Sequence, residues 1–179
     1  TLGIVGLGKI GKAVAKRAKP FGMRVIAVDP FKPDEDFEAV GAERVDIDYL
    51  LANSDVISSH MDLNPTSELY FDAEKFAKME RKPIFLNVSR GGEVDEDAML
   101  DALNTGKILA VGLDVLTSES PELSTCPFIG REDCIVTPHS AFYSDDSIEA
   151  CERISVENAV YYINGEPDKV FKLVQGPRK

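Results

Sequence analysis

The chain has 179 residues, with 31 acidic against 20 basic residues and a formal net charge of −11. This length suffices for one domain or slightly more, and the negative charge disfavours nucleic acids and anionic membranes as partners. No apolar run approaches the ~20 residues that span a membrane, and no signal-peptide layout is present, so we expect a cytoplasmic location.

The chain opens on an apolar strand, residues 2–5, followed by a turn with glycines at 6, 8 and 11 and then a helical pattern. The spacing G-x-G-x-x-G is typical of dinucleotide-binding folds. Gly6 permits the tight turn, Gly8 lets a pyrophosphate approach the backbone, and Gly11 lets the helix pack closely on its strand. The N–H groups and the positive dipole end of the helix would face the two phosphates.

A second apolar run, residues 22–28, ends at Asp29, roughly 20 positions after the glycines as the fingerprint requires. A carboxylate there can accept both hydroxyls of an adenosine ribose and would repel a 2′-phosphate. No arginine directly follows Asp29, so the pattern favours NAD over NADP. The alternative is a solvated aspartate at a strand end.

The rest of the chain alternates strands with helices. Further strands are expected at residues 43–45, 55–59, 83–88, 108–113 and 135–137. Helices are expected at residues 49–52 with Asp48 as the cap, at 72–79, after Asp95 with Gly106 as the stop, and at 144–164. The strands are apolar throughout, as buried parallel strands are. We therefore expect an α/β fold with a Rossmann-type doubly wound parallel sheet in three layers, αβα.

Polar residues follow the ends of these strands, where doubly wound sheets bind their ligands. Besides the glycine turn and Asp29, they are His60, Arg90, Asp114 and His139. We expect them to lie along one crevice.

Arg90, Glu119 and His139 suggest the chemistry of that crevice. The guanidinium of Arg90 suits a carboxylate bidentately. His139 can move a proton near neutral pH while Glu119 orients the ring and holds its charge. Each also has a plainer interpretation: a surface ion pair for Arg90, a solvated loop residue for Glu119, and a turn cap for His139. His60 fits a packed or backbone-supporting residue better than a base.

Three cysteines, Cys126, Cys134 and Cys151, are odd in number and lack metal-ligand spacing, and only two histidines are present. We interpret the cysteines as reduced thiols and expect no metal site.

The chain resembles the D-isomer-specific 2-hydroxyacid dehydrogenases, in particular their NAD-binding domain. Four motifs carry the resemblance, which extends from Leu2 to about Pro167. They are Gly-Leu-Gly-Lys-Ile-Gly at 6–11, Leu-Asn-Val-Ser-Arg-Gly-Gly-Glu-Val-Asp at 86–95, Gly-Leu-Asp-Val at 112–115 and Thr-Pro-His at 137–139. The resemblance implies hydride transfer between NAD(H) and a small D-2-hydroxy or 2-keto acid, and a homodimer.

The resemblance also implies a role for each matching residue. Arg90 would grip the substrate carboxylate and carbonyl, His139 would give the proton, and Glu119 would be its partner. The implied cofactor-binding residues are Gly6, Gly8, Lys9, Ile10, Gly11, Asp29, Met61, Asp62, Ser67, Val88, Ser89, Arg90 and Asp114.

The chain departs from the family pattern in several places. Asp62 stands where a proline is common, Asn64 where a threonine is common, and Ser120 intervenes between Glu119 and the proline that usually follows it. In the family a substrate domain precedes the glycine motif, which here stands at the start of the given sequence. We therefore expect residues 1–167 to be the cofactor-binding domain and residues 168–179 to be a tail leading toward the substrate domain.

Two other functions stay open. One is a non-catalytic NAD-sensing protein like the corepressors that share this fold and triad, although no basic or low-complexity segment supports it. The other is a formate dehydrogenase, but that branch typically carries glutamine where Glu119 stands.

Overall fold

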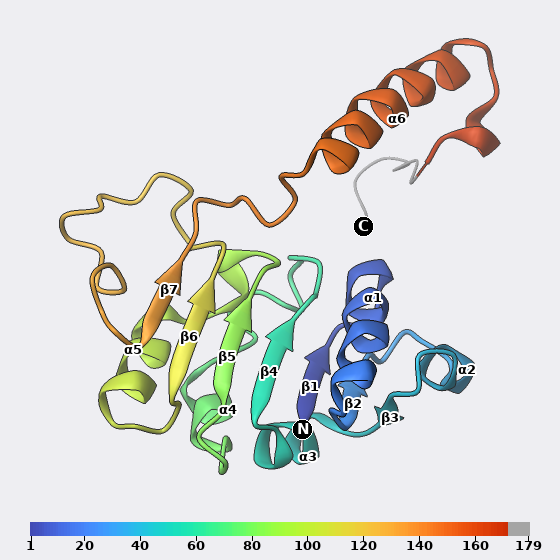
Figure 1. Ribbon diagram of the computed structural model, residues 1–179. Helices are drawn as coiled ribbons and strands as arrows, with labels where there is room; N and C mark the ends of the chain where they lie inside the picture. Colours follow the sequence, from blue (N-terminus) through green and yellow to red (C-terminus); the bar gives the residue numbers. More distant parts are fainter. Residues whose placement is uncertain (172–179) are drawn as a thin grey trace. The chain divides into compact units, whose positions relative to one another are not determined.

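The computed structural model describes residues 1–171 (Figure 1). The chain divides into two compact units, Thr1–His139 and Ser140–Lys179, each of which is described by itself. The predicted tail 168–179 therefore lies partly outside the described residues, because the description ends at residue 171.

The first unit is built on a parallel sheet of seven strands in the order β3-β2-β1-β4-β5-β6-β7. The strands are β1 (Leu2–Val5), β2 (Val25–Val28), β3 (Glu43–Arg44), β4 (Val56–Ser59), β5 (Ile84–Asn87), β6 (Ala110–Leu113) and β7 (Cys134–Val136). The order reverses between β1 and β4, and both neighbours of β1 run parallel to it. This is the switch point at which doubly wound sheets bind their ligands.

Two apolar clusters, one on each face of the sheet, form the core. Leu2 and Ile4 of β1 pack with the first two helices, whereas Val5 packs with the next three, because successive side chains of a strand point to opposite faces. The helices are α1 (Lys9–Ala18), α2 (Asp34–Glu38), α3 (Ile47–Asn53), α4 (Ala73–Ala77) and α5 (Glu96–Asn104). Three 3₁₀ turns are η1 (Lys19–Phe21), η2 (Gly91–Glu93) and, in the second unit, η3 (Pro167–Lys169). The predicted three-layer Rossmann-type fold is confirmed.

The second unit contains one long helix, α6 (Asp145–Ile163), whose first N–H groups are capped by Ser144. The prediction of a closing helix at 144–164 is confirmed. None of the residues of α6 is buried, and Val156, Val160 and Ile163 of its apolar stripe are exposed. Within residues 1–171, no helix combines the length and the apolar character needed to cross a membrane.

One predicted cap is wrong. The cap of α3 is Asp46, whose Oδ1 accepts a hydrogen bond of 2.7 Å from the backbone N–H of Tyr49. Asp48 lies inside the first turn instead, and its carboxylate pairs with Lys78 at 2.9 Å. Asp46 and Asp48 are both residue types that cap helices. Asp46 is the cap because its backbone is still extended, whereas the helix has already begun at Ile47.

Candidate functional site

The glycine turn joins β1 to α1. At two of its positions, Gly6 and Gly11, only glycine fits the backbone geometry and the close contacts. Gly6 has a φ of +93°, and a Cβ at this position would lie 2.7 Å from the carbonyl oxygen of His60. A Cβ at Gly11 would lie 2.1 Å from the carbonyl oxygen of Gly6. By contrast, a Cβ at Gly8 would meet no atom of the described chain within 4 Å. Space is therefore open at the N-terminus of α1, where a phosphate group would find N–H donors and the helix dipole.

Asp29, directly after β2, is tied to that turn. Its Oδ2 accepts a hydrogen bond of 2.8 Å from the N–H of Leu7, and its Oδ1 accepts one of 2.9 Å from Phe31. The carboxylate is half-buried, and each of its oxygens has a second lone pair for a further donor. The carboxylate of Asp29, which is predicted to bind the ribose, is thus held by two hydrogen bonds beside the glycine turn.

The loop after β4 holds the predicted adenosine-side residues. Met61 is half-buried, Asp62 is exposed, and Ser67 is buried with its Oγ donating to the carbonyl oxygen of Asp62 at 2.7 Å. His60 lies at the start of this loop, and its Nε2 is 2.9 Å from Oγ of Ser58. Burial lowers the pKa of His60 to about 4, so its ring is neutral at pH 7. This agrees with a packed residue rather than a base.

The depressed pKa of His60 gives a testable pH dependence. Because the folded state disfavours the protonated ring, the stability from His60 is complete above its unfolded pKa of 6.5 and is lost as the pH falls toward 4. NMR titration of the imidazole signals measures this directly, since the chain has only two histidines and a His139→Ala variant identifies the signal of His60. A titration midpoint of His60 at or above 6.5 would contradict the packed environment.

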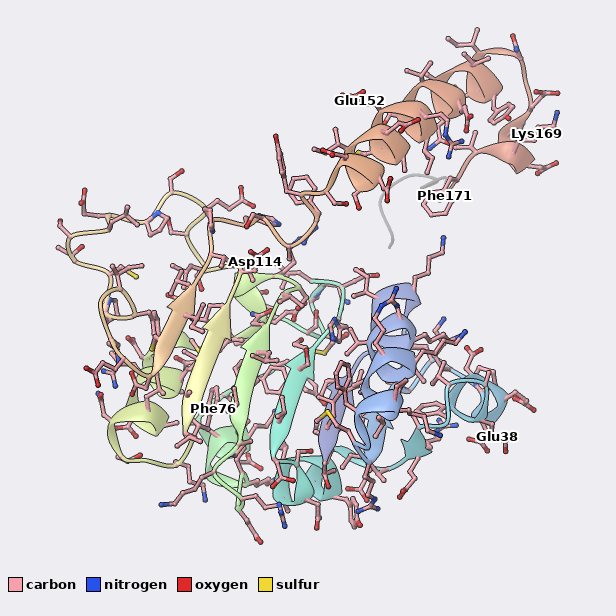
Figure 2. The ribbon with its side chains drawn as sticks, viewed as in Figure 1. Glu38, Phe76, Asp114, Glu152, Lys169 and Phe171 are labelled. Atoms are coloured by element: carbon pink, nitrogen blue, oxygen red, sulfur yellow. The ribbon has the colours of Figure 1, made fainter. Side chains whose placement is uncertain are left out.

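A cavity of about 370 Å³ lies at the carboxyl end of the sheet, and Arg90, Glu119 and His139 all line it. They come from three different loops, after β5, β6 and β7. Asp114 also lines the cavity, and Figure 2 labels it beside the end of β6. The structure therefore brings the three predicted catalytic residues together. The glycine turn and Asp29 are not among the residues that line this cavity.

His139 is held in place by its backbone. It has a φ of +52°, and its N–H donates to the carbonyl oxygens of Asp114 at 2.9 Å and Thr137 at 3.0 Å. The hydroxyl of Thr137 donates to Oδ1 of Asp114, which is 5% exposed. A non-glycine residue with positive φ costs free energy, and such strain persists where the surroundings fix it. The segments that follow β6 and β7 are thus joined by hydrogen bonds at Asp114, Thr137 and His139.

Arg90 lies on a short loop between β5 and η2. Its Nη1 donates to the carbonyl oxygen of Ser89 at 2.7 Å, and its own carbonyl oxygen accepts from Nδ2 of Asn87 at 3.0 Å. A Cβ at Gly91 would lie 2.0 Å from the carbonyl carbon of Leu116, so glycine is required for the close contact between these loops. Val88 is exposed, whereas the hydroxyl of Ser89 is buried and turned inward.

Two features of this region could not be predicted from the sequence. Apolar residues complete the cavity wall, among them Leu116, Leu123, Ile129 and Val136. Most of them lie in loops where no periodicity marks them. The other feature is Glu93, which is fully buried beneath the loop of Arg90. The sequence places an acid there, but nothing in the local pattern separates a buried glutamate from a solvated one.

The glycine turn, the acid after β2 and the cavity at the strand ends together define a dinucleotide-binding α/β domain. Residues 1–141 match the family described as D-isomer specific 2-hydroxyacid dehydrogenase, NAD binding domain. The chain belongs to this family, and its NAD-binding fold is confirmed.

Individual proteins that are similar to this chain carry the names of dehydrogenases and reductases. A D-3-phosphoglycerate dehydrogenase of Methanocaldococcus jannaschii is 39% identical over 93% of this chain and 32% of its own length. A hydroxypyruvate reductase of Blautia hydrogenotrophica is 39% identical over 94% of this chain and 52% of its own length. The crystal structure of a D-lactate dehydrogenase with NAD⁺ from Lactobacillus jensenii is similar with a TM-score of 0.86 and 30% identity, covering 98% of this chain and 55% of that one. The chain spans about a third to a half of the length of these relatives.

Proposed function

We propose that this chain is the cofactor domain of an enzyme that interconverts small 2-keto acids and D-2-hydroxy acids with NAD(H). The observation that carries the proposal is the single cavity lined by Arg90, Glu119 and His139. A guanidinium, a carboxylate and an imidazole are the groups needed to hold a keto acid and to move a proton to its carbonyl oxygen.

The residues of the glycine turn fit the cofactor. The backbone N–H groups of Lys9 and Ile10 would face the pyrophosphate above the open position at Gly8. Asp29 would accept the ribose hydroxyls, and Asp114 would contact the nicotinamide side. The predicted adenosine-side residues are Met61, Asp62 and Ser67, and those beside the nicotinamide are Val88 and Ser89. When bound, nicotinamide supplies the hydride chemistry, and the protein supplies position and the proton.

Arg90 would bind the substrate. Within residues 1–171, its guanidinium makes a hydrogen bond only to the carbonyl oxygen of Ser89, through Nη1. Nε and Nη2 therefore remain to form the two parallel bonds that a carboxylate accepts. When Arg90 binds the carboxylate of the keto acid, the neighbouring carbonyl group of the same molecule is also held in the cavity.

His139 would give its proton to the carbonyl oxygen during reduction and take it back during oxidation. A protonated imidazole gains stability from a nearby carboxylate, and Glu119, which lines the same cavity, would supply it. The hydrogen bonds of its backbone N–H to Asp114 and Thr137 hold the backbone of His139 in place at the carboxyl end of the sheet. Proton transfer by such a positioned group contributes about 10²–10⁴ to the rate.

The direct test is NADH oxidation by the full-length protein, followed by absorbance. We expect turnover with glyoxylate, pyruvate or hydroxypyruvate, and none with simple ketones of the same size, because these lack the carboxylate that Arg90 binds. Turnover with simple ketones at the same rate, or with no 2-keto acid of any size, would overturn the proposal.

The preference for NADH over NADPH depends on Asp29. Titration calorimetry should show NADH binding at least about tenfold more tightly, or ~1.4 kcal/mol, because the carboxylate repels a 2′-phosphate. Asp29→Asn should reduce this preference, and Asp97→Asn, at an exposed residue of α5, should leave it unchanged. Equal affinities in the unmodified protein would refute the role of Asp29.

Three further features stay predictions. They are the homodimer, the cytoplasmic location, and a domain that extends over residues 1–167 before a tail at 168–179. The first compact unit of the structure ends earlier, at His139. Sedimentation of the full-length protein, cell fractionation and limited proteolysis test them in turn.

A further inference from the structure

Glu93 is a buried acid beneath the loop that carries Arg90. Its side chain is 0% exposed, and its Oε1 has no hydrogen-bond partner among the residues that the structure describes. Buried carboxyl groups are rarely left in this condition, because each unsatisfied polar atom costs free energy. Nothing in the proposed chemistry uses Glu93, so its burial needs another explanation.

The other oxygen of Glu93 is the centre of a hydrogen-bond network. Oε2 accepts from Oγ of Ser59 at 2.8 Å and from Oγ of Ser89 at 2.6 Å. The backbone N–H of Ser89 donates to Oδ1 of Asn87 at 3.0 Å, and Nδ2 of Asn87 donates to the carbonyl oxygen of Arg90 at 3.0 Å. A continuous path of hydrogen bonds therefore runs from Glu93 to the backbone of Arg90.

The backbone around Glu93 is held independently of this side chain. Its carbonyl oxygen accepts from the N–H of Phe71 at 2.9 Å, and the N–H of Asp95 donates to the carbonyl oxygen of Phe71 at 3.0 Å. The N–H of Leu69 donates to the carbonyl oxygen of Gly92 at 2.9 Å. Loss of the carboxyl group should therefore leave residues 92–95 in place and loosen only the part of the loop before them.

The surroundings also favour the neutral acid. Burial raises the pKa of Glu93, and the nearby charge of Asp62 raises it further, whereas the two serine hydroxyls and the charge of Arg90 lower it. A carbonyl oxygen without a partner costs less than a carboxylate oxygen without one. Glutamine keeps an acceptor oxygen for the two serines, but its amide nitrogen then takes the position of Oε1, where its N–H donors have no partner.

We propose that Glu93 is a positioning residue that fixes Ser89, and through Asn87 the backbone of Arg90, in the orientation needed to bind the substrate carboxylate. The inference rests on the proposed function of Arg90. It assigns Glu93 no contact with substrate or cofactor.

Kinetics of the full-length protein test this link. Glu93→Leu should raise KM for the 2-keto acid about tenfold, since a small displacement of a positioned group weakens binding strongly, while the dissociation constant of NADH stays unchanged. Glu93→Gln, which keeps an acceptor for both serines but buries an amide group without a partner, should raise KM less than Glu93→Leu. Glu80→Leu, at an exposed glutamate, is the matched control and should change nothing.

A double-mutant cycle shows whether Glu93 acts through Arg90. In an Arg90→Lys background, Glu93→Leu should no longer raise KM, because the group that it positions has been removed. An equal rise in both backgrounds would overturn the inference. So would a change in NADH affinity as large as the change in KM. If Glu93→Leu fails to fold, Ser89→Ala breaks the same path and should raise KM in the same way.

Hydrogen exchange of the full-length protein gives a readout that needs no activity. The N–H of Ser89 donates to Oδ1 of Asn87 at 3.0 Å. Glu93→Leu should speed exchange at Ser89, and exchange at Asp95, which Phe71 holds, should stay slow. Unchanged exchange at Ser89 would overturn the inference even in an active enzyme. An unmodified enzyme that reduces no 2-keto acid but shows the exchange effect would refute the proposed function instead.

Discussion

His139→Ala in the full-length enzyme should lower kcat for 2-keto-acid reduction by about 10³-fold, because it removes the group that gives the proton to the carbonyl oxygen. NADH affinity should stay within about twofold, since His139 is not among the proposed cofactor contacts. Steady-state kinetics and a binding titration on the same protein measure both effects.

The fold should survive this change, because the backbone N–H of residue 139, which alanine also has, donates to the carbonyl oxygens of Asp114 and Thr137. A His139→Asn variant, which tolerates positive φ well, separates a loss of proton transfer from a loss of backbone geometry. Asparagine should be as inactive as alanine. Turnover retained in both variants would remove His139 from the proton-transfer role.

Arg90→Lys should raise KM for the keto acid and lower kcat together, with a loss in kcat/KM of about a hundredfold, or ~2.7 kcal/mol. Lysine keeps the positive charge but cannot form two parallel hydrogen bonds to one carboxylate. Initial rates over a range of keto-acid concentrations separate the two parameters.

Arg24→Lys is a matched control for that experiment. Arg24 makes a bidentate pair with Glu43 at the edge of the sheet, through Nε at 2.9 Å and Nη2 at 2.5 Å. Its replacement loses the same geometry outside the cavity and should leave both kinetic parameters unchanged. A substrate dependence of Arg90→Lys equal to that of the unmodified enzyme would refute the carboxylate clamp.

Most of the fold could be predicted from local patterns. Apolar runs bounded by glycine or acid gave the strands, and Asp72 and Asp95 were correctly predicted at the starts of α4 and α5. The sequence predicted a doubly wound parallel sheet but not the order of its strands, because the order depends on which strands pair with each other. The cap of α3 was wrong by two residues, because Asp46 and Asp48 are both suitable in composition.

The candidate site was predictable where chemistry and topology coincide. Arg90 and His139 both follow predicted parallel strands, so the sheet had to carry both to the same edge. Glu119 lies in the long loop between β6 and β7, where no helical or strand periodicity predicts which side chains face the cavity. Glu93 could not be recognised, because its burial results from contacts with Ser59 and Phe71 that are distant in sequence.

The configuration of the product tests the central claim most directly. If Arg90 fixes the carboxylate, His139 meets the carbonyl oxygen and the glycine turn fixes the cofactor, the hydride can reach only one face of the keto acid. Chiral analysis of the 2-hydroxy acid made by the full-length enzyme with NADH should then show the D enantiomer alone. A racemic product would contradict this account of the cavity, and the L enantiomer alone would contradict the proposed D specificity.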